Sequence, residues 1–117
     1  RPGRSSLPYR RTQLFLSNAG GLMLAELFQI IEDRKANPRP ASYTSQLFAQ
    51  GEDAILKKVG EEAMEVVLAA KGEGRQRLIE EVADLFYHTL VLLSSQGVNL
   101  SDVEDELRRR HQRRSSG

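Results

Sequence analysis

The chain has 117 residues, a length typical of one domain, and hydrophobic residues make up 39% of it, which is enough for a core. It contains no cysteine, which excludes disulfide bonds and cysteine-ligated zinc and fits a reducing compartment, so we expect a cytoplasmic protein. The longest uninterrupted apolar stretch, Val66 to Ala70, is far shorter than the ~20 residues of a membrane span.

The formal net charge of +1 conceals a segregation of charge along the chain. The terminal segments 1–20 and 108–117 contain nine of the 17 basic residues and no acidic residue, so the part between them carries all 16 acids. A nucleic-acid-binding domain normally has its basic patch on the folded body. An acidic body instead favours cations, and we expect neither nucleic acid nor a membrane among the partners.

The pattern of apolar and helix-ending residues predicts an all-α domain over residues 22–111. Residues 1–21, rich in Arg, Ser, Gly and Pro, are expected to form an irregular basic segment that precedes it. Residues 112–117 are expected to form a basic tail. No stretch alternates with a period of two for long enough to predict a strand.

Three or four helices are expected within this domain. They are predicted over residues 22–35, 52–71 and 76–96, and from Ser101 onward. Ser101 is the expected N-cap of the last helix, because Glu104 follows three residues later as in a capping box. The segment 41–50 is interpreted as a loop with one short turn.

The two central helices are apolar almost all the way round. Apart from their acids, the segments 60–70 and 81–93 consist mainly of Ala, Val, Leu, Met and aromatic residues. A helix without a polar face is normally buried on all sides, and a chain of this size has little interior for two such helices. We therefore expect a second copy of the chain to complete the core, in a homodimer or a larger homo-oligomer.

Carboxylates interrupt the first of these helices at positions that share one face. At 100° per residue, Glu62 lies about 100° and Glu65 about 40° from Glu61 around the helix axis. Lys58 lies at about 60°, within the same sector. The pair Glu62/Glu65 has the i, i+3 spacing of neighbours on a helix surface.

The next helix carries a matching pair. Asp84 lies about 60° from Glu81, again at i, i+3, and His88 falls between them on the same face. Taken singly, Glu61, Glu62 and Glu81 are also consistent with ordinary surface acids. Two such pairs on helices joined by a short turn, with apolar neighbours, instead indicate a shared site.

Carboxylates gathered in an apolar bundle repel one another, and each loses hydration worth several kcal/mol. Protonation, pairing with Lys or Arg, or a bound divalent cation would relieve this, and Lys58 is the one clear basic residue on these faces. A hard cation with oxygen ligands, Mg²⁺ or alternatively Mn²⁺, suits an all-carboxylate site. Helix bundles do build metal sites from inward-facing acids on opposed helices.

The pattern Glu-Glu-x-x-Glu, followed across a turn by Glu-x-x-Asp, resembles the signature of the MazG-like all-α nucleotide pyrophosphohydrolases. Within that superfamily, the segments 42–51, 55–62 and 80–88 look specifically like the phosphoribosyl-ATP pyrophosphohydrolase family. The similarity covers about residues 22–111, which is most of the chain.

The resemblance implies a MazG-like dimeric bundle and a metal-dependent enzyme. The implied reaction is hydrolysis of phosphoribosyl-ATP to phosphoribosyl-AMP and pyrophosphate, the second step of histidine biosynthesis. By the family pattern, Mg²⁺ would be held by Glu62, Glu65, Glu81 and Asp84. Glu61 and Glu62 are the expected catalytic residues, with Glu61 holding a second ion or orienting the water.

Four further residues are predicted to bind substrate. Lys57 and Lys58 would offset negative charge on the leaving pyrophosphate, unless they are simply solvated or structural. Tyr43 either lines the substrate entrance or packs against the bundle. His88 is either a general base near the substrate or a hydrogen-bonded structural residue.

Three other functions fit parts of the sequence. A house-cleaning nucleoside triphosphate pyrophosphatase of the same superfamily would share the metal chemistry and differ in the nucleotide that it recognises. A non-catalytic dimeric helical module would explain the apolar helices but not the acids within them. A nucleic-acid-binding domain built on the arginine-rich ends would require strongly salt-dependent binding.

Overall fold

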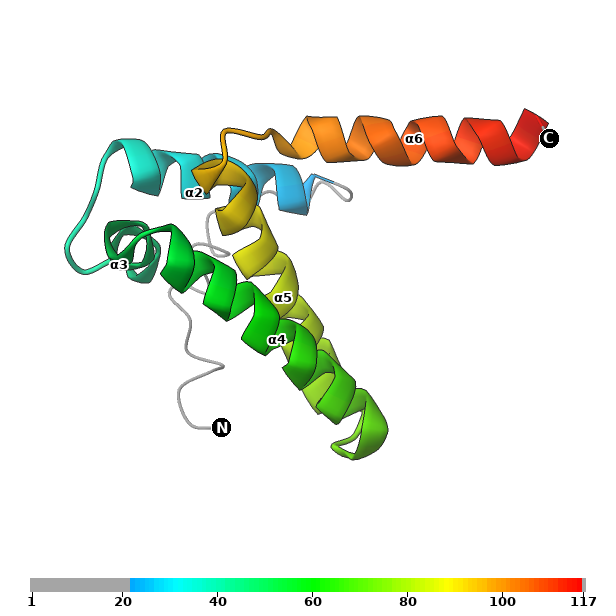
Figure 1. Cartoon of the computed structure of the whole chain (residues 1–117), viewed down its shortest axis with the longest axis horizontal. Coiled ribbons are helices and arrows are strands. Elements are labelled where there is room, and N and C mark those ends of the chain that lie inside the picture. Colours follow the sequence, from blue (N-terminus) through cyan, green and yellow to red (C-terminus); the bar gives the residue numbers. More distant parts are fainter. Residues whose placement is uncertain (1–21, 117) are drawn as a thin grey trace.

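The segment after residue 21 folds into helices wherever the apolar spacing predicts them. The computed structural model describes residues 22–116, which form five helices and no strand (Figure 1). In chain order these are α2 (Met23–Ala36), α3 (Tyr43–Gln50), α4 (Glu52–Gly72), α5 (Arg75–Ser95) and α6 (Leu100–Ser116). The all-α expectation is confirmed, and the expectation for the segment 1–21 lies outside the described residues.

Helix α3 is the element that the sequence analysis interpreted as a loop, and that interpretation was wrong. Its N-cap is Ser42, whose hydroxyl accepts a hydrogen bond of 3.2 Å from the amide of Ser45. A helix of eight residues is too short to be stable alone, so tertiary contacts hold it. Leu47 is buried in the core, and the hydroxyl of Thr44 hydrogen-bonds the hydroxyl of Tyr87 on α5.

Helices α4 and α5 form a long antiparallel hairpin that extends away from α2 and α3 (Figure 1). Gly51 precedes α4 with φ 101° and Gly74 precedes α5 with φ 92°, a conformation that favours glycine at both turns. The two helices of this hairpin make the most extensive contact between any two helices of the described chain.

The hydrophobic core lies at one end of this hairpin. It is formed by side chains from α2, α3, the beginning of α4 and the second half of α5: Leu27, Phe28, Ile31, Leu47, Ile55, Tyr87, Leu90 and Val91. Polar contacts reinforce it, since Lys35 donates a 2.7 Å hydrogen bond to the carbonyl of Ser94, and the hydroxyl of Ser94 donates to Glu32.

The projecting part of the hairpin exposes apolar side chains. Val67 of α4 is 60% exposed and Phe86 of α5 is 50% exposed, and Met64, Leu68 and Ile79 are also exposed. Exposed apolar patches mark interaction sites in many proteins. The single chain therefore leaves uncovered the surface for which we predicted a second copy.

Helix α6 runs outward from the other helices and ends far from them (Figure 1). It begins at Leu100, and the carboxylate of Asp102 accepts a 3.2 Å hydrogen bond from the amide of Asn99, so Ser101 is not the N-cap that we predicted. It also continues to Ser116, whereas we expected the helix to give way to a tail after residue 111.

Charged side chains stabilise α6. The guanidinium of Arg108 lies 2.6 Å from the carboxylate of Asp105, and that of Arg110 lies 2.9 Å from the carboxylate of Glu106. Pairs at these spacings, together with arginines near the C-terminal end of the helix dipole, stabilise a helix that has few apolar residues. No helix within residues 22–116 combines the length and the apolar character needed to cross a bilayer.

Candidate metal centre

Three acidic side chains from α4 and α5 meet between the two helices. Glu62 and Glu81 are 0% exposed and Asp84 is 4% exposed. One carboxylate oxygen from each lies within 4.8 Å of the other two. Glu81 and Asp84 are one turn apart on α5, and Glu62 reaches them from the antiparallel helix α4, as the i, i+3 spacing predicted.

The electrostatics of this cluster favour a bound cation. Burial and mutual repulsion both oppose the ionised form of closely spaced carboxylates. One oxygen of each residue (Oε1 of Glu62, Oε1 of Glu81 and Oδ2 of Asp84) is buried and accepts no hydrogen bond, although each residue has other polar or ionic interactions. A set of three carboxylates is an oxygen-only donor set, which is the chemistry that Mg²⁺ and Mn²⁺ prefer.

Two basic side chains contact the cluster from its edge. The ammonium of Lys58 lies 3.4 Å from Oε2 of Glu62, as the helical positions predicted. The guanidinium of Arg77 lies 2.6 Å from Oε2 of Glu81 and 2.5 Å from Oε1 of Glu80. We had expected Lys58 to be the one clear basic residue on these faces, but Arg77 is a second counter-ion.

Arg77 was not predicted from the sequence, although a simple spacing points to it. Arg77 precedes Glu81 by four residues, the same spacing that relates Lys58 to Glu62. Partial burial opposes its charge, but the hydrogen bond with Glu80 and the charges of Glu81, Glu80 and Glu73 together raise the pKa of Arg77 above its usual value. Arg77 is thus a permanent cation at the edge of the cluster.

The remaining predicted acids lie at the border of the cluster. Glu65, predicted as the fourth metal ligand, is half-buried on α4 and is not among the three residues whose oxygens converge. Glu61, predicted as catalytic, is exposed, and its carboxylate lies 3.9 Å from the ammonium of Lys58. Metal binding by Glu65 and catalysis by Glu61 stay predictions.

Tyr43 and His88 are hydrogen-bonded to each other inside the protein. Nδ1 of His88 donates a 2.8 Å hydrogen bond to the backbone carbonyl of Asp84, and Nε2 lies 2.9 Å from the hydroxyl of Tyr43, from which the neutral imidazole accepts a hydrogen bond. Because His88 is fully buried and both ring nitrogens are used, the geometry favours its structural alternative. The two aromatic side chains link α3 to the backbone of the carboxylate cluster.

Of the two lysines predicted to bind substrate, only Lys58 contacts the cluster. Lys57 is exposed on the adjacent position of α4. Substrate binding by Lys57, Lys58, Tyr43 and His88 stays a prediction.

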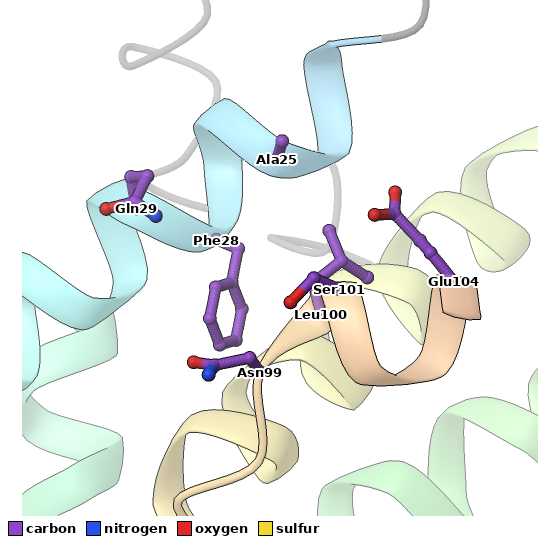
Figure 2. A pocket seen from close by; sticks show the side chains of 7 residues that line it. All are labelled: Ala25, Phe28, Gln29, Asn99, Leu100, Ser101 and Glu104. Atoms are coloured by element: carbon purple, nitrogen blue, oxygen red, sulfur yellow. The ribbon is translucent and has the colours of Figure 1, made fainter. Parts of the chain in front are cut away.

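A separate cavity of 150 Å³ lies between α2 and the beginning of α6 (Figure 2). Its walls are the side chains of Ala25, Phe28, Gln29, Asn99, Leu100, Ser101 and Glu104. None of these residues belongs to the carboxylate cluster or was predicted to take part in the reaction. The cavity therefore lies where α6 leaves the core, apart from the carboxylate cluster.

Comparisons with known proteins identify the family. The family model described as phosphoribosyl-ATP pyrophosphohydrolase matches residues 24–111. The phosphoribosyl-ATP pyrophosphatase of Geotalea daltonii is 54% identical over 88 residues, covering 75% of this chain and 83% of that protein. The enzyme of the same name from Clostridium acetobutylicum is 50% identical over 91 residues, covering 78% of this chain and 83% of that protein.

A third relative, the phosphoribosyl-ATP pyrophosphatase of Limosilactobacillus fermentum, is 53% identical over 87 residues, covering 74% of this chain and 82% of that protein. The matched region contains the carboxylate cluster and both helices that build it. The resemblance drawn from the acidic motifs is confirmed, and the chain belongs to the phosphoribosyl-ATP pyrophosphohydrolase family.

Proposed function

We propose that this protein hydrolyses phosphoribosyl-ATP to phosphoribosyl-AMP and pyrophosphate, in histidine biosynthesis, at a Mg²⁺ centre between α4 and α5. The activity is the one for which its family and its relatives are named. The observation that carries the metal centre is the convergence of three buried carboxylates, Glu62, Glu81 and Asp84, from two facing helices.

This proposal assigns a role to each acidic residue of the centre. Glu62, Glu81 and Asp84 would hold the ion through their converging oxygens, and Glu65, one turn beyond Glu62, would supply a fourth ligand. Bound Mg²⁺ would withdraw charge from the attacked phosphorus and increase the acidity of a water. Glu61 lies at the exposed edge, where it would orient the attacking water.

A triphosphate carries several negative charges, and an acidic cleft repels it unless cations intervene. Lys58 adjoins the cluster and would stabilise the charge that develops on the leaving pyrophosphate. Mn²⁺ shares the preference of Mg²⁺ for oxygen ligands and is expected to replace it.

The same proposal includes a homodimer or larger homo-oligomer that covers the projecting hairpin. It is supported by the exposed apolar side chains of α4 and α5, among them Val67 and Phe86. The proposal also includes the cytoplasmic location that the absence of cysteine predicts.

The test is pyrophosphate release from phosphoribosyl-ATP by the purified protein, with Mg²⁺, with Mn²⁺ and with excess chelator. We expect turnover with either metal, none with chelator, and full recovery when Mg²⁺ is added back. The same assay with dUTP and dCTP provides the matched comparison. Faster release from either deoxynucleotide would assign the protein to house-cleaning, and turnover in chelator would rule out the metal centre.

A further inference from the structure

The two helices of the hairpin carry the same five-residue arrangement of charge. Each has a basic residue followed, three and four residues later, by two glutamates. The segments are Lys58-Val59-Gly60-Glu61-Glu62 on α4 and Arg77-Leu78-Ile79-Glu80-Glu81 on α5. In both, the second glutamate is fully buried in the carboxylate cluster, whereas the first is reached by solvent.

Each basic side chain lies between its two glutamates. The ammonium of Lys58 is 3.4 Å from Glu62 and 3.9 Å from Glu61. The guanidinium of Arg77 is 2.6 Å from Glu81 and 2.5 Å from Glu80. Both cations therefore have an inner partner in the cluster and an outer partner at its edge.

A divalent ion held by Glu62 and Glu81 would stand close to both basic groups, and the like charges would repel. Neither cation would lose all ionic contact if it moved outward. Lys58 would keep Glu61, and Arg77 would keep Glu80 and also Glu73, whose carboxylate lies 3.8 Å from Nε of Arg77. The outer glutamates provide a second position for each charge at little cost.

We propose that Lys58 and Arg77 are exchangeable counter-ions of the carboxylate cluster. Before metal binds, each neutralises the buried glutamate four residues later; when a divalent cation binds, each moves to the outer glutamate three residues later. The two charges then lie at the rim of the cluster, where they contact the phosphates of the substrate. This inference rests on the metal centre proposed above.

The proposal predicts that removing either charge tightens metal binding. A residue that only orients a ligand would have the opposite effect, because its loss weakens the metal site. Coupling between neighbouring sites is typically fivefold or more, so we expect Arg77→Gln and Lys58→Gln each to bind Mn²⁺ about five- to tenfold more tightly without nucleotide.

The experiment is a Mn²⁺ titration of the full chain, with free Mn²⁺ followed by electron paramagnetic resonance. Arg75→Gln on α5 and Lys71→Gln on α4 make the same change in net charge at exposed positions, and they should alter the Mn²⁺ dissociation constant less than about twofold. Arg77→Lys keeps the charge and should bind Mn²⁺ like the unaltered protein.

A second readout separates exchange from a purely structural role. At saturating Mg²⁺, the KM for phosphoribosyl-ATP should rise in Arg77→Gln by a larger factor than kcat falls, because the lost charge contacts the bound triphosphate. If Arg77→Gln does not fold in chelator, Lys58→Gln tests the same exchange on the other helix.

Unchanged or weaker Mn²⁺ binding in Arg77→Gln and Lys58→Gln, with normal binding by the unaltered protein, would overturn the exchange and leave the proposed function intact. Absence of Mn²⁺ binding by the unaltered protein would instead remove the metal centre itself, and the exchange with it.

Discussion

The two ends of the α4–α5 hairpin differ in the kind of side chain that is buried. Where the hairpin meets α2 and α3, it contributes apolar side chains such as Ile55 and Val91 to the hydrophobic core. Along the projecting part, the buried side chains include Glu62 and Glu81, while Val67 and Phe86 are exposed. We call the part that meets α2 and α3 the ordinary end of the hairpin. We call the projecting part, where acidic side chains are buried and apolar side chains are exposed, the inverted end.

This inversion is unfavourable for the stability of a single chain. Burying a carboxylate costs several kcal/mol, and exposed apolar surface gains nothing from the hydrophobic effect. Violations of this kind are expected at functional sites, where the remainder of the fold compensates for them. In the proposed function, the apolar end of the hairpin supports the structure and the inverted end performs the chemistry.

The largest effect is expected on pyrophosphate release, when the carboxylates of the inverted end are changed. Glu62→Gln and Glu81→Gln keep the shape of the side chain and remove one metal ligand. A bound divalent ion contributes several kcal/mol to such reactions, so pyrophosphate release should fall by about a thousandfold or more. Their thermal stability in chelator should stay the same or rise, because a buried charge is removed.

The matched control is Glu52→Gln, which removes a charge from the exposed first turn of α4. It should change pyrophosphate release less than about twofold, since surface substitutions away from the site have small effects. A Glu81→Gln variant with the activity of the control would mean that the cluster has no catalytic function.

The next effect is expected at the ordinary end of the hairpin, where two adjacent residues of α4 differ in burial. Ile55 is 2% exposed and Leu56 is 46% exposed. Ile55→Ala should lower the free energy of unfolding by about 2–5 kcal/mol because it leaves a cavity in the core. Leu56→Ala should cost less than about 0.5 kcal/mol in urea denaturation. A loss at Leu56 that increases on dilution would place it in a contact between subunits.

These two regions also differ in how well the sequence predicted them. The long helices and the convergence of Glu62, Glu81 and Asp84 followed from helical spacing, because periodicity and i, i+3 geometry are local properties. The position of Arg77, four residues before Glu81, is equally local, but Arg77 lies outside the apolar segment 81–93 from which the site was predicted. The superfamily resemblance rested on the same acidic spacing and the family resemblance on the segments 42–51, 55–62 and 80–88, and the comparisons confirmed the family.

The features that could not be predicted depend on contacts between distant segments. Helix α3 is short, and it is held by Leu47 in the core and by Thr44 against Tyr87, 43 residues away. The Tyr43–His88 hydrogen bond spans 45 residues. Sequence periodicity carries no information on such pairs, so the contact between these two residues was not predicted.

The exposed apolar side chains of the inverted end predict a third effect, on assembly. Val67→Asp places a charge on this surface, and burying an unpaired charge in an interface should weaken a dimer about 100-fold or more, or about 2.7 kcal/mol. Light scattering after size exclusion should then report the mass of one chain. Leu107→Asp, an equally exposed apolar position on α6, should leave the mass unchanged. The reverse result would assign the interface to α6.

The smallest predicted effect lies at the ordinary end, where α2 and α5 share an ionised contact. The hydrogen bond from the hydroxyl of Ser94 lowers the pKa of Glu32 below its ordinary value of 4.5; burial opposes this, and Lys35 assists it. A carboxyl group whose pKa is lower in the folded protein stabilises it above the unfolded pKa, and the stabilisation disappears as the pH falls through the folded pKa.

Ser94→Ala should therefore cost about 0.5–1 kcal/mol at pH 7, a modest value because the Glu32 side chain is partly exposed and screened. Urea denaturation at several pH values should show this difference shrinking as Glu32 becomes protonated in acid. Ser95→Ala is the matched control, because its hydroxyl donates a 2.7 Å hydrogen bond to the backbone carbonyl of Leu92, which does not titrate. Its effect should be the same at every pH. If both variants show the same pH dependence, the contact between Ser94 and Glu32 does not contribute to stability through ionisation, and the ordinary end of the hairpin is held by its apolar packing alone.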